Sequence, residues 1–383
     1  MAGLRREPPG HFGLAGVVCA RGRSARAGDA MRPGPSTEAL AGPVAVGARI
    51  DVHLGGVVVA LDIPCEDVQI DWASDRVVPG KLTFTCPSSW VPASPASPLS
   101  NYGQRSHVVA ILETRDGRDE VDLGWWQHQS WEEDPSGKVK VEALDLLQLL
   151  EQDPMPWPSS PRGGATVLSE AQRLAGTLPV VLDPGTPNSP VSPSTQWGHS
   201  RTEAIRDLCH TRGLNWGIKA DGCLHLWAQT DGSEPVARYT GRDLLIEAPR
   251  KSVERRPNRW IVVGSPQQSD DKKPAVKWTG TAVASSWPYE PSTYGWVTER
   301  KEFNAAASAG AVHKAAHTNM ANALSAASRR SVEIASDPRL EAGDVIAVHT
   351  DAGEVIVGKV TAYSLPVDKP GGQMRIDMEE LAW

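Results

Sequence analysis

Two histidines have the spacing of metal ligands on a helix. His313 and His317 are four residues apart in an alanine-rich stretch, so both imidazoles can face one metal ion if that stretch is helical. The three residues between them are Lys-Ala-Ala, and the glutamate that follows the first histidine in helical zinc hydrolases is absent. The sequence therefore favours a solvated helix face over a metal centre at this pair.

A second cluster combines cysteine with histidine. Cys209 and His210 are adjacent, and Cys223 and His225 are separated by one residue. Neither half has the two-residue spacer typical of zinc sites, and Cys209 falls on the apolar face of an expected helix. We therefore expect core cysteines and incidental histidines here, with no metal bound.

The cysteine count indicates reduced thiols. The chain has five cysteines, an odd number without repeated spacing, as expected for a protein made in a cytoplasm. Cys65 and Cys86 could pair across a hairpin, but no convincing export signal precedes them. The short apolar run from Phe12 to Ala20 is broken by glycine and followed by arginines. We therefore favour two reduced core thiols.

Every enzyme signature in the sequence is incomplete. A phosphate loop and a dinucleotide glycine fingerprint are absent, and the tripeptide from Gly198 to Ser200 is only a fragment of a nucleophile elbow. The carboxylates from Glu132 to Asp134 could serve a glycosidase, but Pro135 and Gly137 beside them are typical of a solvated turn. We therefore predict no catalytic residue, no cofactor and no enzymatic activity.

Tryptophan is over-represented among the aromatic residues. The chain has 14 tryptophans against 3 phenylalanines and 5 tyrosines. Indole rings can stack on sugars or anchor protein interfaces, while the coding bias of a GC-rich genome is an equally good explanation. The candidates for interface residues are Trp125, Trp126, Trp131, Trp287 and Trp296.

Length and charge exclude several classes of protein. A chain of 383 residues is expected to divide into about two to four domains. The net charge is −7, and basic residues concentrate only in the N-terminal head and from Arg250 to Arg259. Specific nucleic-acid binding needs a stronger positive footprint. A membrane-spanning helix needs about 20 apolar residues in succession, and the sequence has no such window.

The order of the expected elements divides the chain into five parts. Residues 1–43 are rich in Gly, Pro and Arg and are expected to be a flexible arm. Residues 44–153 alternate short β-prone runs with turns, typical of a first β-barrel-like domain. Residues 154–250 are expected to be a small α+β domain, 251–330 a β segment with a long Ala-rich helix, and 331–383 a closing β-barrel domain.

The fold class is therefore expected to be α+β and mostly β. Two small antiparallel β-barrel domains, a small α+β domain and the long helix would form a multidomain architecture. Met31 is a candidate for the true start, because the first convincing fold signal begins only at Val44.

A segment near the C-terminus resembles a known family. The run from Asp337 to Ile346 is similar to the final domain of tail hub proteins from siphophages of actinobacteria, where a Pro-x-Leu-x-x-Gly-Asp turn leads into the closing strands. Gly343 and Asp344 are the structural turn in this resemblance. Further matches follow the family's order, at Val57 to Ala60, Thr202 to Arg212, Arg259 to Gly264 and the Ala-rich helix.

The resemblance implies a structural protein of the virion tail tip, assembled in the host cytoplasm. It implies a homotrimer whose barrel domains form a ring around the channel for DNA, joining a six-fold tail tube to a three-fold tip. The implied partners are the distal tail or tail tube protein, the tape measure protein and downstream tip or receptor-binding proteins. A tail-associated cell-wall hydrolase and a receptor-binding module are the alternatives.

Overall fold

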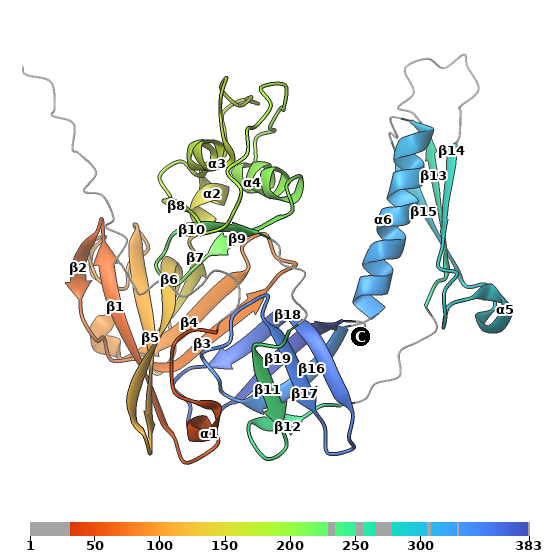
Figure 1. Ribbon diagram of the computed structural model, residues 1–383. Coiled ribbons are helices and arrows are strands. Elements are labelled where there is room, and N and C mark those ends of the chain that lie inside the picture. The colour runs from red at the N-terminus through yellow and green to blue at the C-terminus, as the bar shows by residue number, and fades with distance from the viewer. Residues whose placement is uncertain are drawn as a thin grey trace, which may run out of the picture.

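The computed structural model describes residues 31–228, 234–249, 256–265, 278–304, 308–327 and 329–381. Within these residues the protein is mostly β, and most of its helical residues lie in two places (Figure 1). The cysteine of the N-terminal head and most of the basic cluster from Arg250 lie outside the described residues.

The first half of the main sheet has seven antiparallel strands in the order β2-β1-β5-β6-β7-β4-β3. Alternation of buried and half-exposed residues is typical of such strands. In β4 the side chains of Leu82, Phe84 and Cys86 are buried, while the residues between them are half-exposed. The strands are β1 (Ala45–Leu54), β2 (Val57–Ala60), β3 (Glu66–Ala73), β4 (Gly80–Cys86), β5 (Gln104–Thr114), β6 (Gly117–Glu133) and β7 (Val139–Asp145). A short 3-10 helix, η1 (Ser88–Trp90), follows β4.

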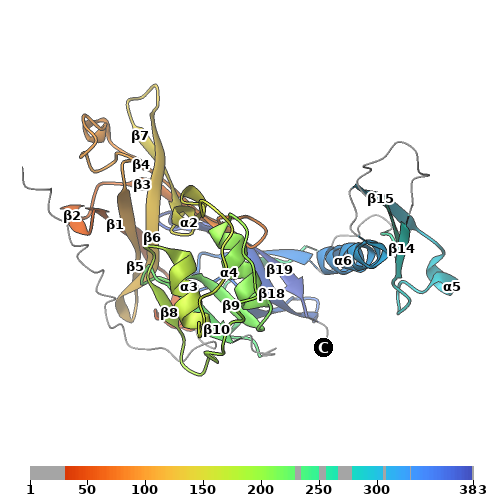
Figure 2. The same cartoon turned by 90° about the horizontal axis from the view of Figure 1, so that it is seen from above.

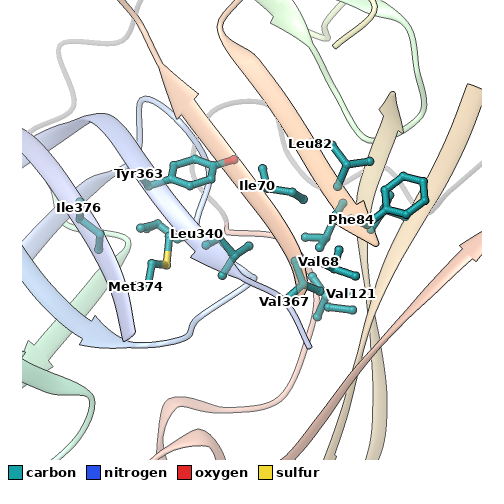
Figure 3. Close-up of a cluster of buried hydrophobic side chains, with 14 of the residues drawn as sticks. Val68, Ile70, Leu82, Phe84, Val121, Leu340, Tyr363, Val367, Met374 and Ile376 are labelled. Atoms are coloured by element: carbon teal, nitrogen blue, oxygen red, sulfur yellow. The ribbon is translucent and has the colours of Figure 1, made fainter. Parts of the chain in front are cut away.

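A second half of six strands continues the same sheet. Strand β18 pairs antiparallel with β3, so that Tyr363 lies opposite Trp72 and their rings stack with centroids 6.2 Å apart. One buried apolar cluster spans both halves (Figure 3). The strands are β11 (Ala237–Thr240), β12 (Leu245–Glu247), β16 (Arg329–Ala335), β17 (Val345–His349), β18 (Val355–Pro366) and β19 (Gln373–Glu380).

The two halves are not closed into the barrels expected from the sequence. Among the described residues they form one open 13-stranded sheet that runs from β12 to β2. In each half, however, the two end strands are consecutive in the chain: β2 and β3 in the first, β11 and β12 in the second. Strands β11 and β12 also belong to this sheet, although the expected α+β domain included them.

The small α+β unit covers residues 148–228 and lies beside the first half of the sheet (Figure 2). Its helices begin where the sequence provides caps, because the side chains of Thr166 and Ser200 accept hydrogen bonds from the backbone N–H groups of Ser169 and Glu203. The elements are α2 (Gln148–Gln152), α3 (Val167–Ala175), β8 (Val180–Leu182), α4 (Arg201–His210), β9 (Leu214–Ile218) and β10 (Leu224–Ala228).

A third unit, the projecting unit, stands away from the main sheet in both views (Figures 1 and 2). Its helix packs on its sheet because Gly280 has no side chain: a Cβ there would lie 2.4 Å from the carbonyl oxygen of Val312. The elements are β13 (Arg259–Ser265), β14 (Trp278–Val283), α5 (Pro291–Tyr294), β15 (Thr298–Asn304) and α6 (Ala309–Ala327). The sequence predicts helix α6 from Asn304 to Arg330, but Asn304 pairs with Ser265 at the end of β15, and the helix spans Ala309–Ala327.

Residues 31–43 differ from the flexible arm that their composition predicts. They contain helix α1 (Thr37–Leu40), in which Ala39 and Leu40 are buried. The backbone N–H of Arg32 donates to the carbonyl of Arg339 at 2.8 Å. We call residues 31–41 the N-terminal strap, because they bind to the second half of the sheet.

Candidate assembly surfaces

Gly343 and Asp344 form a hydrogen-bonded turn before β17. Gly343 has φ +87°, a conformation that glycine adopts without strain, and its N–H donates to the carbonyl of Val360 at 3.0 Å. The carboxylate of Asp344 accepts from the N–H of Glu341 at 2.8 Å, and burial raises the pKa of Asp344 to about 7. The turn therefore serves the fold.

The N-terminal strap meets this turn through Arg32. Its guanidinium donates to the carbonyls of Pro338 and Leu340 at 3.1 and 2.8 Å and forms an ion pair with Glu341 at 3.2 Å. The strap thereby satisfies carbonyls in the segment before Gly343 that would otherwise need other partners. The turn matched by the family motif is thus clamped by a segment from the other end of the chain.

Three of the five candidate tryptophans are engaged within the chain. The ring of Trp125 stacks on that of His107 and meets that of His53 edge-on, with centroids 4.7 Å apart in each pair. Trp126 is 6% exposed and donates from its indole to the carbonyl of Leu123. Trp131 is partly buried against the main core. These side chains stabilise the monomer, and their role in an interface stays a prediction.

The other two tryptophans lie on the surface of the projecting unit. Trp287 is 81% exposed and Trp296 is 54% exposed. The loop between them is held by Asn258, whose side-chain amide donates to the carbonyls of Tyr289 and Gly295 at 2.9 and 2.8 Å. A hydrogen-bonded loop that presents exposed indole rings is typical of a contact surface, so both residues remain interface candidates.

An apolar edge of the main sheet is a candidate that the sequence analysis missed. On β2 and just after it, Val57, Val58, Val59 and Leu61 are 65%, 46%, 36% and 68% exposed. The sequence predicts an antiparallel hairpin here but no exposed surface, because an apolar run does not reveal its own exposure. The signal that was available is the run of three valines without polar alternation, which is unusual for a solvated edge strand.

One pair of side chains has the composition of a catalytic dyad but lies inside the core. The ring Nε2 of His128 is 2.7 Å from the hydroxyl of Ser106, and its Nδ1 is 3.1 Å from the carbonyl of Ser100. Ser106 is 0% exposed, so a substrate cannot reach its hydroxyl. Burial lowers the pKa of His128 to about 4, and the neutral ring fastens the loop before β5 to the sheet.

His225 is held as a cation in the α+β unit. Its Nδ1 lies 2.6 Å from Asp183 Oδ1, and its Nε2 lies 3.0 Å from Asp221 Oδ2. Burial would lower the pKa of His225, but hydrogen bonds and attraction from the two carboxylates raise it to about 9. Lys219 adds a third contact, to Asp183 at 2.7 Å. The two ring nitrogens face different carboxylates, so the cluster is an ion-pair clamp between β10 and its neighbours.

The remaining candidates from the sequence are placed as follows. Cys209 is buried in the core of the α+β unit, while His313 and His317 are exposed on α6. Cys65 and Cys86 are free thiols, and burial raises the pKa of each to about 12. Within the described residues no three His, Cys, Asp or Glu side chains gather around a point that could hold a metal ion.

A surface depression of about 660 Å³ lies where the two halves of the sheet meet. Its lining mixes arginine with aspartate, including Arg375 and Asp377 from β19. Arg375 Nε lies 3.5 Å from Asp377 Oδ1. Such a mixture selects neither an anion nor a cation. No helix in the described part of the chain is long and apolar enough to cross a membrane.

The fold is similar to that of solved tail proteins, one of them from a prophage. The tail protein from Neisseria meningitidis MC58 matches with a TM-score of 0.57 at 17% identity, over 87% of this chain and 97% of the other. The 43 kDa tail protein of prophage MuSo2 from Shewanella oneidensis matches with a TM-score of 0.55 at 12% identity, over 86% and 98%. No protein-family model and no curated protein sequence matches the chain. The likeness establishes a shared fold.

Proposed function

We propose that this protein is a structural component of a phage tail, a hub that assembles as a trimeric ring at the tail tip. The observation that carries the proposal is the organisation of the main sheet. Each chain contains two half-sheets whose end strands are consecutive in sequence, fused through the β3–β18 pair. Three copies would present six such halves around one axis, and closed symmetric assembly is the usual state of protein oligomers.

In this role the ring joins a six-fold tail tube to a three-fold tip. Each half-sheet would form one of six barrel-like units facing the tube. The partners are then the distal tail or tail tube protein, the tape measure protein and downstream tip or receptor-binding proteins, in a siphophage of actinobacteria. The shared fold with solved tail proteins and the resemblance of the segment before β17 support this assignment.

The channel enclosed by the ring would let DNA pass without binding it specifically. Each phosphate that pairs with lysine or arginine adds affinity through counterion release. The net charge of −7 is suited to weak repulsion of DNA. The ring is therefore proposed to be a passage and a joint, without a specific nucleic-acid site.

The buried polar groups also fit a structural role. The hydroxyl of Ser106 and the ring of His128 are enclosed, and both nitrogens of His225 are occupied by carboxylates. Perturbed titratable groups often mark catalytic sites when they line a cleft. In this protein the perturbed groups hold loops and strands together, as expected in a structural protein.

Mass measurement and labelling test the proposal. Native mass spectrometry of the purified protein is expected to give three times the 41.1 kDa subunit mass, and antibody labelling in electron micrographs is expected at one end of the tail. A stable monomer in solution and in the virion, or label along the whole tail, would contradict it. Release of fragments from purified cell wall would favour the hydrolase alternative.

A further inference from the structure

Two strand edges at opposite ends of the molecule lack the usual protection against pairing. Free edges of β-sheets are normally guarded by charge, proline or a cover, because their unpaired N–H and C=O groups attract other strands. Strand β2 ends the main sheet and consists of Val-Val-Val-Ala, with its valines exposed. Strand β14 ends the sheet of the projecting unit and also carries no charge, with Thr279, Thr281 and Val283 exposed.

The other free edges in the described residues differ from these two. Strand β15, at the opposite edge of the same small sheet, carries Glu299, Arg300, Lys301 and Glu302. Strands β11 and β12 carry Arg238 and Glu247. Strands β8 and β9 lack charge, but none of their side chains is exposed. Among the free edges in the part of the chain that the structure describes, only β2 and β14 combine an uncharged sequence with exposed side chains.

The projecting unit has a small apolar cluster of its own. Its apolar cluster has four buried members, Val262, Ala282, Val312 and Ala316, and among the described elements the main contacts of α6 are with β13 and β14. A unit with so small a core is marginal by itself, and small domains usually gain stability by association. The main sheet of the same subunit does not supply that association, because the projecting unit stands apart from the main sheet (Figures 1 and 2).

We propose that the β14 edge of one subunit pairs with the β2 edge of a second copy of this chain. The two edges are different surfaces at opposite ends of the molecule (Figures 1 and 2), so their contact is heterologous. A heterologous contact closes into a ring when the rotation between subunits allows it. The inference rests on the proposed ring and adds to it by naming the strands that join its subunits.

Cysteine cross-linking of the full-length protein tests the pairing. Variants Val58→Cys and Thr281→Cys place one thiol in the middle of each edge, and directly paired strands bring opposite Cβ atoms within the range of a disulfide. The variant with both substitutions is expected to give covalent dimers and trimers under mild oxidation. Each single variant is expected to stay monomeric on a non-reducing gel, like the wild-type protein with its native thiols.

A matched control uses the charged edge of the same small sheet. The combination of Val58→Cys with Arg300→Cys places the second thiol on β15, and it is expected to give no covalent trimer. Cross-linking of Val58→Cys alone would mean that β2 pairs with itself, which overturns the proposal. Equal cross-linking through Arg300→Cys would show random collision and would overturn it as well.

Charge exchange gives a second, independent readout. Val58→Lys alone and Thr281→Glu alone place a charge on an edge and are expected to raise the concentration needed for assembly by about tenfold or more. The two together place opposite charges on the joined edges and are expected to restore most of the assembly. A trimeric mass that neither single variant weakens would leave the ring standing and refute the β2–β14 contact. A wild-type monomer would refute both.

Discussion

The carboxylate of Asp337 and the guanidinium of Arg339 form an ion pair in the interior of the protein. Arg339 Nη2 lies 2.7 Å from Asp337 Oδ2, and Arg339 Nε lies 2.9 Å from Asp337 Oδ1. The side chain of Arg339 is 8% exposed and that of Asp337 is 0% exposed. Arg339 also donates to the carbonyl of Pro35 and the hydroxyl of Thr37. The pair therefore ties the N-terminal strap to the segment before β17.

Removal of this carboxylate is expected to be costly. Asp337→Ala leaves the buried charge of Arg339 without its partner, and we expect the free energy of unfolding to fall by about 3–5 kcal/mol. Urea unfolding of the full chain measures this change. The control Asp116→Ala removes a pair with Arg115 in which both side chains are mostly exposed, and it is expected to cost under about 1 kcal/mol. Equal losses in the two variants would contradict the clamp.

The turn at Gly343 is expected to reject a β-branched residue. At φ +87°, Gly343→Val is strained even though the nearest atom outside the turn is 3.7 Å from an added Cβ. We expect a loss of about 1–3 kcal/mol in the free energy of unfolding. Gly47→Val is the matched control, because Gly47 lies in β1 with open space and an ordinary φ. A thermal shift of the same size in both variants would show that backbone conformation is not the cause.

Gly280 is expected to control the attachment of α6. In Gly280→Ala the added carbon would meet the backbone of Val312, and overpacking of this kind costs about 1–3 kcal/mol. Hydrogen exchange is expected to become faster in α6 and β14 and to stay unchanged in β5. Gly310→Ala, in the first turn of α6 with no atom nearer than 3.7 Å, is expected to leave exchange equal or slower. Unchanged exchange in Gly280→Ala would overturn the close-packing argument.

His225 is expected to make the stability of the α+β unit depend on pH. Its pKa of about 9 in the folded protein lies above the ordinary value of 6.5, so its stabilising contribution is complete below pH 6.5. That contribution is lost as the pH rises through about 9. The difference in unfolding free energy between wild type and His225→Gln is expected to shrink over this range. A difference that is constant from pH 6 to about 10 would refute the clamp, and His210→Gln on the exposed end of α4 serves as control.

Local patterns in the sequence predicted local structure well. Ser200 followed by Glu203 predicts a helix start, and α4 begins directly after Ser200. The Gly55-Gly56 pair predicts a hairpin turn, and both glycines have positive φ between β1 and β2. The sequence predicts no helix or strand at residues 298–303. Their charged sequence gives no periodic signal, and it is pairing with β13 that makes them a strand.

Long-range partners could not be predicted in the same way. Strand β3 has several suitable neighbours by composition, and its pairing with β18 from the other end of the chain fuses what were expected to be separate domains. The N-terminal strap has few apolar residues. It is ordered by the hydrogen bonds of Arg32 to two carbonyl groups and by the ion pair of Arg32 with Glu341. The candidate tryptophans could not be ranked, because burial of Trp126 and exposure of Trp287 follow from tertiary packing.

The projecting unit has one further consequence, for the way in which the protein can change during evolution. The chain leaves the main sheet after β12 and returns in β16, and these strands are antiparallel neighbours, with Leu245 opposite Ile334. A short hairpin turn would reconnect them without disturbing any other ladder. The projecting unit is therefore an insertion between two strands that are neighbours in the main sheet. Recombination there can replace it with another module while the rest of the gene is inherited intact.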